Sequence, residues 1–171
     1  YVNGFKAGAV AQKPGLNLPV TYTNSFGDIT LAAEAANGHM AAGADVLSGT
    51  AEMVVGAIAA AQQKGGVLWF GTQANQAQLA PDIVVASQVY HWEVLLRPIV
   101  NDIDAGVANG RSQVATLADG GLVIEYNPGY ALPEDVLDMA YDVLRHRLVL
   151  SYEALSDNVS ADDLLKKLMG R

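Results

Sequence analysis

The residues best suited to binding a ligand are uncharged, and they gather where short apolar runs of the chain end. Aromatic rings stack on a flat ring, while amides and hydroxyls hydrogen-bond to its edge. Such side chains occur at residues 24–26, 48–50, 71–73 and 87–92. The aromatic residues at or near these run ends are Phe26, Trp69, Phe70, Tyr90 and Trp92. The pattern indicates recognition of a flat ring by stacking and hydrogen bonding.

These side chains do not all have the same expected role. Trp69 and Phe70 belong to an apolar run, so we expect both in the core. Phe26 and Trp92 stand on loops, where a binding role and a surface role are both open. A ligand contact is also open for His91. Gln73, Asn75 and the turn at 48–50 are expected to supply hydrogen bonds to the ligand.

Sequence motifs for catalysis and metal binding are absent. There is neither G-x-x-x-x-G-K-[ST] nor a strand-linked G-x-G-x-x-G, so nothing would hold the phosphates of a nucleotide and Mg²⁺. No G-x-S-x-G surrounds a serine at a run end. The three histidines are far apart and none has a ligand partner at helical spacing. We therefore expect no catalytic residue, no metal site and no cofactor.

The order of the expected elements predicts an α/β fold. Short apolar strands are expected near 18–22, 44–48, 67–70, 83–87 and 122–126, and helices near 29–42, 51–64 and 92–105. A first helix should contain Phe5, Ala9 and Val10 and end at Lys13. Apolar strands separated by helices are typical of a parallel sheet covered on both faces. Ligands of such sheets lie outside the carboxyl ends of the strands.

The stretch GVLWFGTQANQAQLAPD, residues 66–82, illustrates this arrangement. We interpret its apolar half as a buried central strand. The polar residues that follow are then expected to face a ligand at the end of that strand. They are Thr72, Gln73, Asn75 and Gln76.

The overall composition narrows the class of protein further. The chain has 171 residues, a net charge of −8 and no cysteine, and 51% of its residues are hydrophobic. A core can form, and the acidic balance argues against nucleic acid or an anionic membrane as the main partner. We expect one domain with a small appendage, no apolar run that spans a bilayer and no signal peptide.

The last forty residues differ in character from the rest. From residue 132 the density of charge rises and glycine nearly disappears. An apolar stripe with helical spacing is formed by Val136, Met139, Ala140, Val143, Leu144 and Leu148. A second helix is expected from Ser160, with Asp163 completing a capping box. We therefore predict an α/β domain at 1–129 and a small helical unit at 130–171.

Four stretches together resemble the BMP family, the PnrA-like substrate-binding proteins of ABC transporters. They are VNGFKAGA, VTYTNSFGDITLAAEAANGHMAAGADVLSG, KGGVLWFGTQANQAQLAPDIVVASQVYHWEV and GGLVIEYNPGY. The resemblance covers about residues 1–130. It implies a flavodoxin-like three-layer lobe of a type I periplasmic binding protein, with only the second of two lobes matched. The family places a purine nucleoside or a related compound between its lobes.

The resemblance also implies roles for individual residues. Phe26 resembles a loop aromatic that stacks on the base, and Gly49 and Thr50 resemble a turn that lines the cleft. Gln73 stands where many members have an aspartate for the ribose hydroxyls, and Tyr90 where many have a lysine. Trp92 resembles the tryptophan that begins this helix in some members. The two departures remove charge and favour a neutral base or another ring compound.

The tail carries a second resemblance. YALPEDVLDMAYDVLRHRLVLSYEALSDNVSADDLLKKLM resembles the C-terminal helical lid of MoxR-type AAA+ ATPases. In that family an arginine of the lid senses the γ-phosphate, which here would be Arg145 or Arg147, although a surface position is the favoured interpretation. A receptor lobe joined to an ATPase lid indicates a chimera, with its junction at 126–133.

Together these patterns predict a substrate-binding component without catalysis. The family implies an ABC-transporter permease as partner and a periplasmic or extracellular, membrane-anchored location. A lobe without its mate should expose the face of its cleft, so self-association through that face is expected. Two alternatives stay open: a recombined α/β scaffold that binds no ligand and whose tail packs on the sheet, and a fragment related to the MoxR ATPases.

Overall fold

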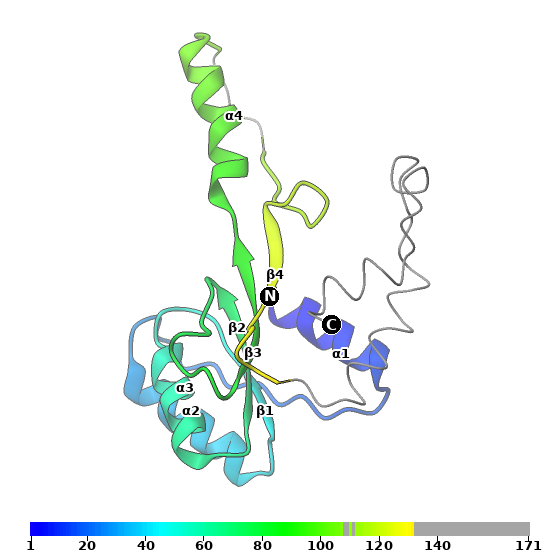
Figure 1. Cartoon of the computed structure of the whole chain (residues 1–171), viewed down its shortest axis with the longest axis vertical. Coiled ribbons are helices and arrows are strands. Elements are labelled where there is room, and N and C mark those ends of the chain that lie inside the picture. Colours follow the sequence, from blue (N-terminus) through cyan, green and yellow to red (C-terminus); the bar gives the residue numbers. More distant parts are fainter. Residues whose placement is uncertain (108–109, 111, 132–171) are drawn as a thin grey trace. The chain divides into compact units, whose positions relative to one another are not determined.

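The computed structural model describes residues 1–107, 110 and 112–131 (Figure 1). Chain contacts group the residues into two units, Tyr1–Tyr130 and Ala131–Arg171. The description below therefore concerns the first unit. The helices expected in the tail, its apolar stripe, and Arg145 and Arg147 lie outside the described residues. The division into domains at 129 and 130 stays a prediction.

The first unit alternates helices and strands, as the sequence predicts. Its helices are α1 (Val2–Gln12), α2 (Ile29–Ala41), α3 (Val54–Lys64) and α4 (Trp92–Asp104). Its strands are β1 (Val46–Ser48), β2 (Leu68–Gln73), β3 (Val84–Tyr90) and β4 (Leu122–Tyr126). Most observed bounds lie within two or three residues of the expected ones.

The strands form one sheet in the order β1-β2-β3-β4. The pairs β1–β2 and β2–β3 are parallel, and β4 pairs antiparallel with β3. Residues that pair across neighbouring strands share a face of the sheet, so Ser48, Phe70, Ala86 and Tyr126 lie on one face. The mixed α/β fold class with a mostly parallel sheet is thereby confirmed.

The core lies between the sheet and the pair α2 and α3 (Figure 1). The helix α3 contacts β2, and α2 contacts α3. Trp69, 1% exposed, and Val84 supply the sheet side of this core, as expected for Trp69. Phe70 points to the other face and is half-buried. The helix residues buried here are Ala32, Ala36, Met40, Val54, Ala57, Ile58 and Ala61.

Local signals set the ends of these helices. The Asp28 carboxylate accepts hydrogen bonds from the backbone N–H groups of Thr30 and Leu31, 3.0 and 3.1 Å away, and so caps α2 as predicted. After α3 the chain turns at Gly65, whose φ of 71° lies in the left-handed region that glycine tolerates.

One expected strand is wrong. Residues 16–23 form no strand, although 18–22 are apolar enough to suggest one. Pro19 has no N–H to donate to a ladder, and β1 at the adjoining edge has only three residues. Side chains hold the segment instead: Thr21 Oγ1 lies 3.0 Å from Nε2 of His39 on α2, and Thr23 Oγ1 lies 3.1 Å from Sδ of Met53.

In the part of the chain that the structure describes, there is no helix whose length and hydropathy would let it cross a membrane. The longest described helices, α2 and α4, have thirteen residues each. A spanning helix needs about twenty apolar residues.

The close approach of α2 and α3 generates a stability prediction. A Cβ added at Gly56 would meet the backbone carbonyl of Ile29, which cannot move without displacing the start of α2. We expect Gly56→Ala to lower the free energy of unfolding by about 1–3 kcal/mol, the cost typical of overpacking. Chemical denaturation followed by circular dichroism measures this change.

Gly38→Ala is the matched control on the neighbouring helix. A Cβ at Gly38 meets nothing within 4 Å, so helix propensity alone should stabilise that variant by up to about 1 kcal/mol. Equal effects of the two substitutions would contradict the packing proposed for Gly56.

Candidate functional site

The predicted site residues lie along one edge of the sheet. Because β1, β2 and β3 are parallel, their carboxyl ends meet at that edge. Gly49 and Thr50 follow β1, and Gln73 ends β2. Asn75 comes two residues after β2. Tyr90 ends β3, and Trp92 begins α4.

Phe26 joins this edge through a loop. The backbone N–H of Met53 donates to the carbonyl of Phe26 at 2.9 Å, which holds the loop beside the turn after β1. The Thr23 hydroxyl near Met53 Sδ adds a second attachment. The ring of Phe26 is 83% exposed. The loop thus presents an aromatic ring to solvent beside the strand ends.

The turn after β1 and the end of β2 are bonded to each other. The Thr72 hydroxyl donates to the Gly49 carbonyl at 2.7 Å, and the Ala51 N–H donates to Gln73 Oε1 at 3.2 Å. Ala51 and Gln73 have φ values of 78° and 71°, in the left-handed region where residues other than glycine are strained. Such strain tends to gather at functional positions. Thr50 is exposed between these bonded residues.

Packing accounts for the glycine at position 49. A Cβ there would lie 3.0 Å from Val54 Cγ1 and 3.3 Å from Trp69 Cη2. Glycine therefore lets the turn close over the buried indole. Packing therefore explains why position 49 is a glycine, independently of the cleft-lining role that the sequence resemblance implies.

Two of the four polar residues expected to face a ligand are instead buried. Thr72 and Gln76 are 2% and 8% exposed. Gln76 Oε1 accepts from the Trp69 indole N–H at 2.7 Å, and its Nε2 donates to the Thr72 carbonyl at 3.0 Å. The Gln76 N–H donates to Ser87 Oγ at 3.0 Å. For Thr72 and Gln76 the ligand-facing expectation is wrong, since their polar groups bond inside the protein.

Gln73 and Asn75 are exposed, as expected, but both have internal partners. The Asn75 amide donates to Glu125 Oε2 at 2.6 Å and accepts from the Ala77 N–H at 2.9 Å. Nε2 of His91 lies 3.6 Å from the other oxygen of Glu125. Sequence reasoning missed Glu125, because it lies fifty residues from Asn75 and alternates with apolar residues of β4.

Tyr90 and Trp92 form an aromatic pair at the end of β3. Their ring centroids are 5.3 Å apart at 46°, and Trp92 is 57% exposed. On the same face the Ser48 hydroxyl donates its one hydrogen to the Phe70 carbonyl at 2.7 Å. Ser48 Oγ can then only accept from Tyr1, so the Tyr1 hydroxyl is the donor of the bond between them. Burial raises the pKa of Tyr1. Tyr1 was absent from the predicted set.

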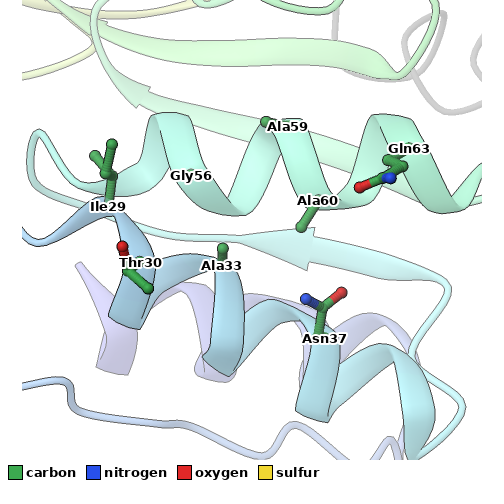
Figure 2. Close-up of a pocket in the computed structure, with 8 residues that line it drawn as sticks. All are labelled: Ile29, Thr30, Ala33, Asn37, Gly56, Ala59, Ala60 and Gln63. Carbon is green, nitrogen blue, oxygen red and sulfur yellow. The ribbon is translucent and has the colours of Figure 1, made fainter.

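A separate groove of about 350 Å³ lies between α2 and α3 (Figure 2). Figure 2 shows its small side chains, including Ala33 and Ala60, on the facing surfaces of the two helices. None of its lining residues belongs to the predicted set. The groove offers no ionisable side chain, so the strand ends remain the better candidate for polar recognition.

The described residues contain no group of three or more His, Cys, Asp or Glu side chains that could hold a metal ion. Arg145 and Arg147 stay a sequence prediction, since they lie outside the described residues.

Comparison with known proteins identifies what the chain is similar to. The family model for PnrA-like ABC transporter substrate-binding proteins, Bmp, matches residues 1–146. Basic membrane protein B of Borreliella afzelii is 34% identical over 88 residues, 50% of this chain and 26% of that protein. A solved ABC transporter solute-binding protein from Conexibacter woesei is 25% identical with a TM-score of 0.60, covering 86% of this chain and 51% of that one.

A further similarity is of a different kind. Chaperone MoxR1 of Mycobacterium tuberculosis is 38% identical over 74 residues, 41% of this chain and 20% of that protein. Since the PnrA-like match extends to residue 146, part of the MoxR1 similarity falls within it. The chain thus spans about half of the solved structure and about a quarter or less of either curated relative.

The buried amide network predicts a large effect from a small change. Gln76→Leu should lower the free energy of unfolding by about 1–3 kcal/mol, because it leaves the Trp69 N–H buried without a partner. The Thr72 carbonyl loses one of its hydrogen bonds and keeps the one from the Ala74 N–H. Thermal and urea unfolding followed by circular dichroism measure the change.

Gln78→Leu provides the control, since Gln78 is exposed in the same loop. It should change the free energy of unfolding by no more than about 0.5 kcal/mol. A Gln76 variant as stable as the Gln78 variant would show that the network does not hold the loop.

Proposed function

Because this chain belongs to the PnrA-like family of ABC transporter substrate-binding proteins, we propose that it binds a purine-like ring compound at the carboxyl ends of β1, β2 and β3. Phe26 and Trp92 stack on the ring, and Gln73, Asn75 and the turn at 48–50 bond to its polar edge. The chain performs no chemistry on the compound. Its role is solute binding for transport.

The exposed ring of Phe26 is the observation that carries the proposal. An 83% exposed phenylalanine is costly to hold in water unless something covers it. The Met53–Phe26 backbone bond fixes its loop beside the turn after β1. A flat ligand stacked there also reaches Thr50 and Gln73, which belong to the adjoining strand ends.

The chemistry of the edge favours a neutral ligand. Gln73 and Tyr90 stand where many members of the family have an aspartate and a lysine, as the sequence resemblance implies. The Glu125 carboxylate is already engaged by Asn75 and His91. Recognition of a base is therefore favoured over recognition of ribose hydroxyls.

The partners follow from the family. We propose an ABC-transporter permease as the receiving partner, and a periplasmic or extracellular location with a membrane anchor. The chain spans 51% of the length of a solved relative. Self-association through the exposed strand ends stays a prediction.

A second candidate rests on the similarity to chaperone MoxR1. In this alternative the chain is a chimera whose tail derives from an ATPase lid, and Arg145 or Arg147 meets the γ-phosphate of a nucleotide held by another protein. The sequence has no Walker motif of its own. Mg-ATP is therefore the probe that separates this candidate from solute binding.

Amide NMR titration of the chain with adenosine, guanine and Mg-ATP tests the proposal. Adenosine or guanine should shift the amide signals of Phe26, Thr50, Gln73 and Trp92. Phe26→Ala should weaken that binding by about 1–3 kcal/mol, the contribution of one aromatic stacked on a base. The fitted dissociation constants measure the loss.

Tyr22→Ala is the matched control, because Tyr22 is a 75% exposed aromatic four residues earlier. It should leave the dissociation constant unchanged. Equal affinity of the Phe26 variant and the unmodified chain would remove Phe26 from the site. Shifts with Mg-ATP alone would favour the second candidate, and silence with all three probes would favour a scaffold without a ligand.

A further inference from the structure

Three polar side chains from separate elements meet beside the strand-end edge. Asn75 follows β2, Glu125 lies on β4, and His91 directly precedes α4. Asn75 Nδ2 donates to Glu125 Oε2 at 2.6 Å, and His91 Nε2 lies 3.6 Å from Glu125 Oε1. We propose that Glu125 is a positioning residue of the strand-end site: this Asn75–Glu125–His91 link holds the loop after β2 and the start of α4 together, and its strength depends on the charge of His91.

The register of the sheet explains why Glu125 meets Asn75. Glu125 pairs with Ser87 across β3 and β4, and residues that pair in this way point to the same face of a sheet. Ser87 Oγ accepts from the Gln76 N–H at 3.0 Å, so the loop after β2 folds back over this face. The residue before Gln76 in that loop is Asn75. The pairing of β4 therefore brings the carboxylate to the amide.

The bonds of Asn75 fix the direction of its amide. Its Oδ1 accepts from the Ala77 N–H at 2.9 Å, and a backbone N–H can only donate. Its Nδ2 must then face the Glu125 carboxylate, which can only accept when it is ionised. Because the amide nitrogen and not the amide oxygen meets Glu125, the cluster is a row of hydrogen-bonding groups and not a set of ligands for a cation.

The other end of the link lies at the start of α4. His91 is the N-cap residue of α4, and Trp92 follows it directly. The His91 N–H donates to the Gly121 carbonyl at 3.0 Å, which attaches this junction to the segment before β4. The imidazole beside Glu125 adds a side-chain contact to this backbone bond. Glu125 therefore connects the elements that carry two residues of the proposed site, Asn75 and Trp92.

The charge of His91 is the variable part of the link. A histidine ordinarily changes its charge between about pH 5 and 8. When His91 is protonated, its charge is opposite to that of Glu125, and at 3.6 Å the two side chains form an ion pair. Both side chains are 37% exposed, so solvent screens the pair and its effect is small.

Other ionisable groups also lie near His91. Tyr90 and Glu93 are close to it in the chain, and Asp119 bonds to Gly121. The Gly121 N–H donates to Asp119 Oδ1 at 2.7 Å, and this bond lowers the pKa of Asp119. Tyrosine and carboxyl side chains ordinarily change their charge outside the range of histidine. A response of the link between pH 6 and 8 is therefore assigned to His91.

The consequence for solute binding rests on the function proposed above. The link orders the loop after β2 and the start of α4 before a ligand arrives. Without Glu125 the ligand would have to order both, which should weaken binding by about two- to tenfold. Protonation of His91 tightens the link, so the affinity for adenosine should be about two- to fivefold higher at pH 6 than at pH 8.

NMR of the full chain without a ligand provides the first test. The side-chain NH₂ signals of Asn75 should move between pH 8 and pH 6 with the same midpoint as the imidazole signal of His91. His91→Gln and Glu125→Gln should each abolish this movement. His39→Gln is the matched control and should keep it, because His39 lies on α2 beside Thr21. An Asn75 signal that does not follow His91 would overturn the proposal.

Titration with adenosine provides the second test. Glu125→Leu should raise the dissociation constant about two- to tenfold at pH 8. Glu125→Gln can still accept from the Asn75 amide, so it should keep the affinity at pH 8 and lose the gain at pH 6. In the unmodified chain 500 mM salt should reduce that gain, because salt screens an exposed ion pair. Equal affinity of the unmodified chain and both variants at each pH would contradict a positioning role.

The two tests separate a failure of this proposal from a failure of the proposed function. If adenosine binds equally well at both pH values, solute binding stands and the role of the His91 charge is overturned. If neither adenosine nor guanine shifts any signal, the proposed function fails and the positioning role fails with it. The titration without a ligand still decides in that case whether Glu125 links Asn75 to His91.

Discussion

The need to satisfy one buried indole N–H organises the strand-end region. Trp69 is the largest fully buried side chain of the described core, and its N–H would be unpaired in an apolar layer. Gln76 provides the acceptor, and to do so the chain must fold back immediately after β2. The second amide hydrogen-bonding group of Gln76 then meets the Thr72 carbonyl. The backbone of 72–76 is thereby fixed by a residue buried beneath it.

The small residues around this network follow from the same constraint. A Cβ at Gly71 would lie 2.5 Å from Ser87 Oγ and 2.8 Å from Gln76 Oε1, so only glycine leaves room for the hydrogen bonds. A Cβ at Gly49 would lie 3.3 Å from Cη2 of the indole, which is also a close approach. The packing of the core therefore determines where Gln73 and Asn75 emerge at the surface. The candidate site is an outcome of how Trp69 is buried.

Much of the fold can be predicted from the sequence because its signals are local. Each of these signals sets the boundary of a helix or strand only a few residues away. They are the acceptor oxygen of Asp28, the helix ends at Gly43 and Gly65, and the apolar run before Gly71. The failures concern partners far along the chain. The sequence cannot tell that residues 18–22 lack a strand to pair with, that Gln76 serves Trp69, or that Asn75 meets Glu125 fifty residues later. Polar residues at a strand end suggest ligand recognition equally well whether their partners are inside or outside the protein.

This ambiguity bears on how the edge could recognise a ligand. Gln73 Oε1 and both ends of the Asn75 amide already have protein partners, so a ligand would exchange one hydrogen bond for another and gain little from it. Net affinity must then come from covering exposed rings, of which Phe26 and Trp92 are the largest at this edge.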